Sequence, residues 1–172
     1  MAANIKRWPI TYPDAMAIIR RHQDIAPVQV IKIAEDLGIN VYKASHFTDI
    51  SGMIKLDKEA GGSSGYAIYV NGKHANTRRR FTIAHECAHF VLHRERIGDG
   101  IIDDALYRSG LSSREEAAAN QLAADILMPW HLINAAMERG IETVESLALH
   151  FEVSRSAMSI RLGVPYETTN PG

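Results

Sequence analysis

The chain has 172 residues, 46% hydrophobic and 23% charged, which suits one domain with its own core (1–172) and excludes a disordered or collagen-like chain. Its 19 Lys and Arg residues nearly balance 20 Asp and Glu residues, so the formal net charge of −1 gives no overall attraction to nucleic acid or to an anionic membrane. A single cysteine, no apolar run near the roughly 20 residues of a membrane span, and no secretory signal predict a cytoplasmic protein. Its unusual feature is a set of eight histidines.

The first half of the chain predicts two helices and a small sheet. After an irregular lead-in at 1–13, apolar residues recur at helical spacing over 14–21. A second helix is expected to hold Pro27 in its first turn and to stop at Gly38. Residues 14–75 should therefore contain these helices and three short strands, the last preceded by a glycine-rich loop, at 39–42, 53–56 and 66–70.

The second half is predicted to be mostly helical. The strongest helical segments cover 80–93 and 112–128, and Pro129 ends the second of them. We therefore expect an α+β fold in which a small antiparallel or mixed sheet packs on the helix of 80–93. Residues 76–129 would form the central helices and 130–165 the C-terminal ones, at 130–139, 143–151 and 154–162.

One segment of the first strong helix has the HExxH pattern. His85 and His89 lie one turn apart on one helix face, where two imidazoles can share a zinc ion at about 2.1 Å each. Glu86 lies beside them, where it can accept a proton from water on the metal without being a ligand. An apolar stripe is expected to bury this helix and leave the motif at the floor of a cleft, and its members are Phe81, Ala84, Ala88 and Leu92.

A catalytic zinc site of this type needs a third protein ligand. His93 continues the histidine row but lies about 12 Å along the helix from His85, which is too far for one ion. Glu95 could be the third ligand only if a glycine broke the helix before it, and Leu92 occupies the position of that glycine. Glu116, on the next strong helix, is the best candidate.

Two neighbours compete with Glu116. Glu115 is one residue away and faces about 100° around the helix, and Asp125 is a weaker competitor. Asn120 follows Glu116 by one turn on the same face, where its amide can hold a ligand histidine or the carboxylate in place. A carboxylate ligand on a second helix with such a partner is the gluzincin arrangement.

The two helical segments together resemble the ImmA/IrrE family of zinc metallopeptidases. Residues 80–93 (RFTIAHECAHFVLH) and 116–129 (EAAANQLAADILMP) are close to the family's usual RFTIAHELGHFLLH and ExEANxFAAxLLMP. With flanking similarities, the resemblance spans about residues 25–165. The chain departs from the family pattern at Cys87-Ala88, Ala118 and Leu122. None of these departures removes a proposed ligand. Ala118 stands where the family usually has a glutamate, and the loss of that carboxylate bears on the charge of the cleft.

The resemblance implies a zinc endopeptidase whose protein substrate is a helix-turn-helix repressor of a mobile element or stress regulon, often encoded beside it. By matched position, His85, His89 and Glu116 would bind zinc and Glu86 would be the general base. The same ligands can also take Fe²⁺ or Mn²⁺. Direct binding to nucleic acid or to a membrane is not expected.

Two further roles are assigned as expectations. The strand with Tyr66, Ile68 and Val70 precedes the active helix, and we expect it to bind substrate as an added strand through backbone contacts. The donor that stabilises the oxyanion is not identified by the sequence. Its candidates are His131, His150 and Tyr107.

The C-terminal helices have the spacing of a helix-turn-helix. Residues 141–172 carry two arginines against four glutamates, a net charge of −2 that argues against docking on phosphates and so against a DNA-binding regulator. We interpret them as a helical pair packed on the peptidase core, and Cys87 as a buried structural thiol. The competing hypothesis for the whole chain is a non-catalytic zinc-containing module that sequesters a transcription factor or belongs to a toxin–antitoxin pair.

Overall fold

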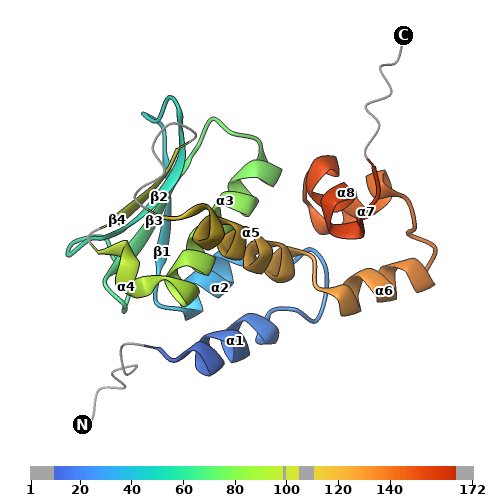
Figure 1. Ribbon diagram of the computed structural model, residues 1–172, viewed down its shortest axis with the longest axis horizontal. Coiled ribbons are helices and arrows are strands. Elements are labelled where there is room, and N and C mark those ends of the chain that lie inside the picture. Colours follow the sequence, from blue (N-terminus) through green and yellow to red (C-terminus); the bar gives the residue numbers. More distant parts are fainter. Residues whose placement is uncertain (1–9, 99, 105–110, 166–172) are drawn as a thin grey trace.

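A mixed sheet lies at one end of the molecule and the C-terminal helices at the other, with two long helices between them (Figure 1). The computed structural model describes residues 10–98, 100–104 and 111–165. Among these residues no helix is long and apolar enough to cross a bilayer. In chain order the elements are α1 (Tyr12–Arg21), α2 (Val30–Asp36), β1 (Asn40–Ala44), β2 (Ile50–Leu56), β3 (Tyr66–Asn71), α3 (Asn76–Leu92), α4 (Arg94–Ile97), β4 (Gly100–Asp104), α5 (Ser113–Leu127), α6 (Trp130–Glu138), α7 (Val144–Phe151) and α8 (Arg155–Leu162).

The sheet is mixed and has the order β1-β3-β2-β4. β3 pairs in parallel with β1 and antiparallel with β2, and β2 also pairs antiparallel with β4. The α+β fold with a small mixed sheet is therefore confirmed. The strand β4 was not predicted, because a five-residue segment with two terminal aspartates carries little strand signal.

The expected role of β3 in binding substrate is wrong. β3 has a hydrogen-bonded neighbour on each side, so it offers no free edge to a peptide. Its side chains Tyr66, Ile68 and Val70 are only 6%, 0% and 2% exposed and belong to the core. Within the described sheet the outer strands are β1 and β4.

The first two helices begin at residues other than those predicted. α1 begins at Tyr12, two residues before the predicted start, because the hydroxyl of Thr11 caps the helix by accepting a hydrogen bond from the backbone N–H of Asp14. α2 begins at Val30, so Pro27 precedes the helix and is not in its first turn.

Helix α3 lies in the interior of the protein. Every residue from Thr82 to Phe90 is buried, since the sheet covers one side of the helix and α5 the other. This is more burial than a single apolar stripe would give. Leu92 was expected in that stripe, but it is 37% exposed because the helix ends at this residue and the chain turns away at His93.

The C-terminal helices are fastened to α3 and α5. Arg80 donates hydrogen bonds to the carbonyls of Phe151 and Glu152, the last of α7 and the next residue. Arg161 of α8 forms an ion pair of 2.8 Å with Asp125 of α5 and donates to the Met128 carbonyl. The prediction that these helices pack on the core is confirmed.

Candidate metal centre

Three side chains from α3 and α5 converge on one point. The Nε2 atoms of His85 and His89 lie 3.0 Å apart. One carboxylate oxygen of Glu116 lies 3.2 Å from Nε2 of His85, and the other lies 3.3 Å from Nε2 of His89. The His89 side chain is fully buried and the other two are 6% and 16% exposed, so the three donors meet in a largely enclosed place.

Local sequence explains how each of the two helices presents its side chains to the other. The i, i+4 spacing puts His85 and His89 on one face of α3. α5 starts at a capping box in which the Ser112 hydroxyl accepts from the backbone N–H of Glu115, and the Glu115 carboxylate accepts from that of Ser112. This cap fixes the first turn of α5, and Glu116 is the next residue in that turn.

The three donors fit a metal ion. At metal–ligand distances of about 2.0–2.1 Å, two ligands of a tetrahedral ion lie about 3.3–3.4 Å apart, which is close to the separations in this site. Two imidazoles and a carboxylate are a donor set typical of zinc, and three protein ligands leave a fourth position for water or substrate. His85, His89 and Glu116 can therefore hold a metal ion.

The electrostatics of the ligands favour binding of a cation. Burial, with the charge of His85 nearby, lowers the pKa of His89 to about 4, so its imidazole is neutral at pH 7. The hydrogen bond with His85 lowers the pKa of Glu116, which keeps the carboxylate ionised. Neutral imidazoles and an ionised carboxylate are the forms in which these groups bind metal.

The competitors of Glu116 have other partners. Glu115 binds Ser112 in the capping box and forms an ion pair of 3.3 Å with Arg96. Asp125 pairs with Arg161, more than two turns from Glu116 along α5. Asn120 lies one turn beyond Glu116, exposed on the wall of a neighbouring cavity, and its role in orienting a ligand stays a prediction.

The other sequence candidates lie in different surroundings. His131 bonds the carbonyl oxygen of Gln23 at 2.7 Å, and the ring of His150 packs edge-on against Phe151. Tyr107 lies outside the described residues. Cys87 is fully buried, and this burial raises the pKa of its thiol, as expected for a structural cysteine.

Sequence reasoning missed the partner of His89. His93 was excluded as a ligand because of its distance from His85, but its Nδ1 atom lies 3.0 Å from Nδ1 of His89. The i+4 spacing from His89 was the signal for this contact, because residues at that spacing are neighbours on a helix surface.

Comparisons with known proteins agree with this geometry. The IrrE N-terminal-like domain, Peptidase M78, matches residues 34–163. A solved structure described as a Mycobacterium tuberculosis transcriptional regulator has a similar fold, with a TM-score of 0.57 at 18% identity over 92% of this chain. The chain spans about half of that protein, since the match covers 49% of its length. No curated protein matches the sequence significantly. Because the family match covers most of the chain and includes the three side chains that could hold a metal ion, the protein belongs to the ImmA/IrrE family of the Peptidase M78 type.

Proposed function

We propose that this protein is a zinc-dependent endopeptidase that cleaves a specific regulatory protein in the cytoplasm, a helix-turn-helix repressor encoded near it. The observation that carries the proposal is the convergence of His85, His89 and Glu116 within 4.8 Å, one residue from Glu86, in a chain of the Peptidase M78 family. When bound, the ion would polarise the scissile carbonyl and acidify a water molecule.

The chain's own residues have distinct tasks in this proposal. His85, His89 and Glu116 hold the ion and leave one position open. Glu86 is fully buried and follows His85 directly in α3. As general base it accepts the proton of the attacking water, and it then passes that proton to the leaving amine. A buried carboxylate suits this task because little water competes with the reacting groups around it.

The test compares the zinc-loaded wild type with Glu86→Gln, using the purified repressor encoded beside the gene as substrate and mass spectrometry as readout. Glu95→Gln is the matched control, because Glu95 is an exposed glutamate on α4. We expect cleavage by the wild type and the control and none by Glu86→Gln, with zinc retained in all three. Binding of the repressor without cleavage by any of them would favour the sequestering module instead.

A further inference from the structure

A cavity of about 580 Å³ lies near the candidate metal centre, and none of the three proposed ligands is part of its wall. It is lined by α3, α5, α8 and the turn before α8, and its volume is typical of a site that binds a small ligand or a few side chains. Phe81 in its wall is one helical turn before His85, and the two rings stack at 26° with centroids 6.4 Å apart. Asn120 in the wall is one turn after Glu116. Two residues of the cavity wall are therefore one helical turn from the proposed ligands His85 and Glu116, and one of them, Phe81, contacts the ring of His85.

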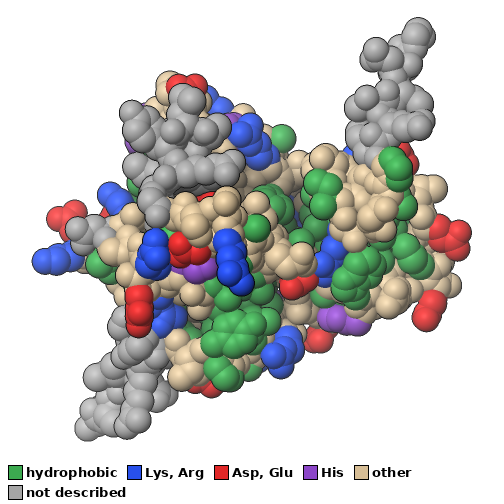
Figure 2. Space-filling model, in the orientation of Figure 1, with side chains coloured by type: hydrophobic (Ala, Val, Ile, Leu, Met, Phe, Trp, Pro, Cys, Tyr) green, Lys and Arg blue, Asp and Glu red, His purple; other side chains and the backbone are tan. Residues whose placement is uncertain are grey.

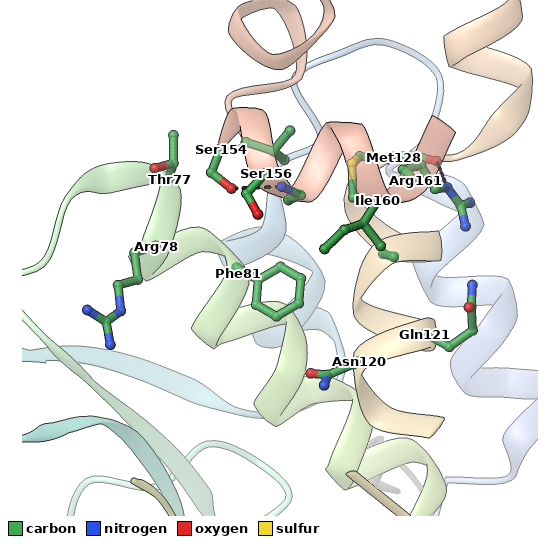
Figure 3. A pocket seen from close by; sticks show the side chains of 13 residues that line it. Thr77, Arg78, Phe81, Asn120, Gln121, Met128, Ser154, Ser156, Ile160 and Arg161 are labelled. Atoms are coloured by element: carbon green, nitrogen blue, oxygen red, sulfur yellow. Dashed lines mark hydrogen bonds between the residues drawn. The ribbon is translucent and has the colours of Figure 1, made fainter. Parts of the chain in front are cut away.

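The lining of this cavity is mainly apolar. Met128 and Val153 form buried parts of it, with exposures of 1% and 5%. Ile160 stands at its rim with 79% of its surface exposed, and Figure 3 shows this side chain extending from α8 toward the ring of Phe81. A large branched side chain held open to water beside an aromatic ring favours contact with another apolar group. Figure 2 shows hydrophobic side chains on both sides of the notch between the C-terminal helices and the rest of the molecule.

The two arginines of the lining do not make it an anion site. Figure 3 shows Arg78 directed away from Phe81, and its guanidinium donates to the Ser51 hydroxyl at 3.1 Å. Arg161 is held by its ion pair with Asp125. Uncharged polar groups surround the apolar part instead and can bind a peptide backbone; they are Thr77, Asn120, Gln121, Ser154 and Ser156.

We propose that this cavity binds a large apolar side chain next to the scissile bond of the protein substrate, and that Phe81 and Ile160 set the preference. The inference rests on the proposed peptidase function for the identity of the occupant. It also assigns a task to the C-terminal helices, because α8 supplies the wall opposite α3. The substrate segment is then apolar at this position and not acidic or basic.

The first test does not depend on catalysis. The zinc-loaded protein is labelled with ¹³C at its isoleucine δ-methyl groups and titrated with N-acetyl-phenylalanine methylamide or N-acetyl-glutamate methylamide. We expect the Ile160 resonance to shift and saturate with the phenylalanine compound alone. Ile25, which is 75% exposed before α2, is the internal control and should not move. Equal shifts with both compounds, or none with either, would overturn the assignment.

The second test measures specificity with a library of synthetic decapeptides, whose cleavage sites are identified by mass spectrometry. Ile160→Glu is compared with Leu149→Glu, a matched change at a leucine that is 81% exposed on α7 and outside the cavity. We expect Ile160→Glu to reduce cleavage beside large apolar residues by roughly tenfold or more and Leu149→Glu to leave it unchanged. The same preference in both variants would overturn the inference. If the wild type cleaves neither the repressor nor any peptide, the peptidase proposal fails, and the titration still decides whether the cavity binds apolar groups.

Discussion

The Nδ1 atom of His89 lies 3.0 Å from the Nδ1 atom of His93, the residue that follows the last one of α3. Two facing ring nitrogens form a hydrogen bond only when one of them carries the proton. If His89 donates, its lone pair is on Nε2, which is the atom that faces His85 and Glu116. His93 is thus placed to select the tautomer of His89 that binds metal.

We predict that His93→Phe weakens zinc binding about 10- to 100-fold, because outer partners of metal-binding histidines contribute to affinity in this range. His93→Gln, whose carbonyl oxygen can accept the same proton, should restore part of the loss. The measurement is competition for zinc with a chelator of known affinity. His46→Phe, at an exposed histidine before β2, is the control. An affinity equal to that of the control would show that His93 does not orient His89.

Neighbouring glutamates on α5 give a second test. Glu116→Ala removes a proposed ligand and should abolish stoichiometric zinc binding at micromolar metal. Glu115→Ala removes the carboxylate half of the capping box and the ion pair with Arg96, so we expect a small loss in the free energy of unfolding with zinc binding retained. Metal content after dialysis and urea denaturation separate the two effects. If Glu115→Ala lost zinc and Glu116→Ala kept it, the third ligand would be Glu115 and the prediction would be wrong.

The candidate metal centre was predictable because each of the two helices that contribute to it has its own local sequence signal. The HExxH spacing places two histidines on one helix face without reference to the rest of the fold, and Glu116 lies in the first turn of a helix whose cap is visible in the sequence. The helical segments of the second half followed for the same reason.

The order of the strands was not predictable from local pattern. β3 is apolar along its length, as a strand covered on both sides should be, but this pattern does not say which strands are its neighbours. The parallel pairing of β1 with β3 removes the free edge that substrate would need. The cavity was likewise missed, because α8 is far from α3 in sequence and brings Ile160 toward Phe81 only in the folded chain.

The pKa of His89 predicts how the metal-free protein responds to acid. In the unfolded chain this histidine has a pKa near its ordinary value of 6.5, whereas burial lowers the folded value to about 4. Between these two pH values the unfolded state binds the proton and the folded state does not, so stability is lost as the pH falls through this window. The lowered pKa of Glu116 acts in the same direction below pH 4.5.

We therefore expect the free energy of unfolding of chelator-treated protein to fall by a few kcal/mol between pH 6.5 and 4. His89→Asn should flatten this dependence, since the variant lacks the titrating group. Urea denaturation at several pH values is the measurement, and His46→Asn is the control for a histidine at the surface. Identical pH profiles for the wild type and His89→Asn would contradict the prediction.

Gly52 of β2 packs closely against helix α3. A Cβ atom at this position would lie 2.6 Å from Cγ2 of Thr82 on α3 and 2.9 Å from the carbonyl oxygen of Tyr69 on β3. Both distances are too short for a carbon atom, so Gly52→Ala must displace α3 or the strand. Because Thr82 is three residues before His85, a displaced helix also moves the metal ligands.

We predict that Gly52→Ala lowers the free energy of unfolding by about 1–3 kcal/mol and weakens zinc binding. Thr82→Ser removes the Cγ2 methyl group, so it should restore part of the stability in the double variant, and the Tyr69 carbonyl limits the rescue. Gly72→Ala is the control, because an added Cβ there has its nearest neighbour at 3.4 Å, and we expect a change within about 0.5 kcal/mol. A double-mutant cycle by urea denaturation measures the coupling. Strict additivity of the two changes would show that Thr82 does not require the glycine.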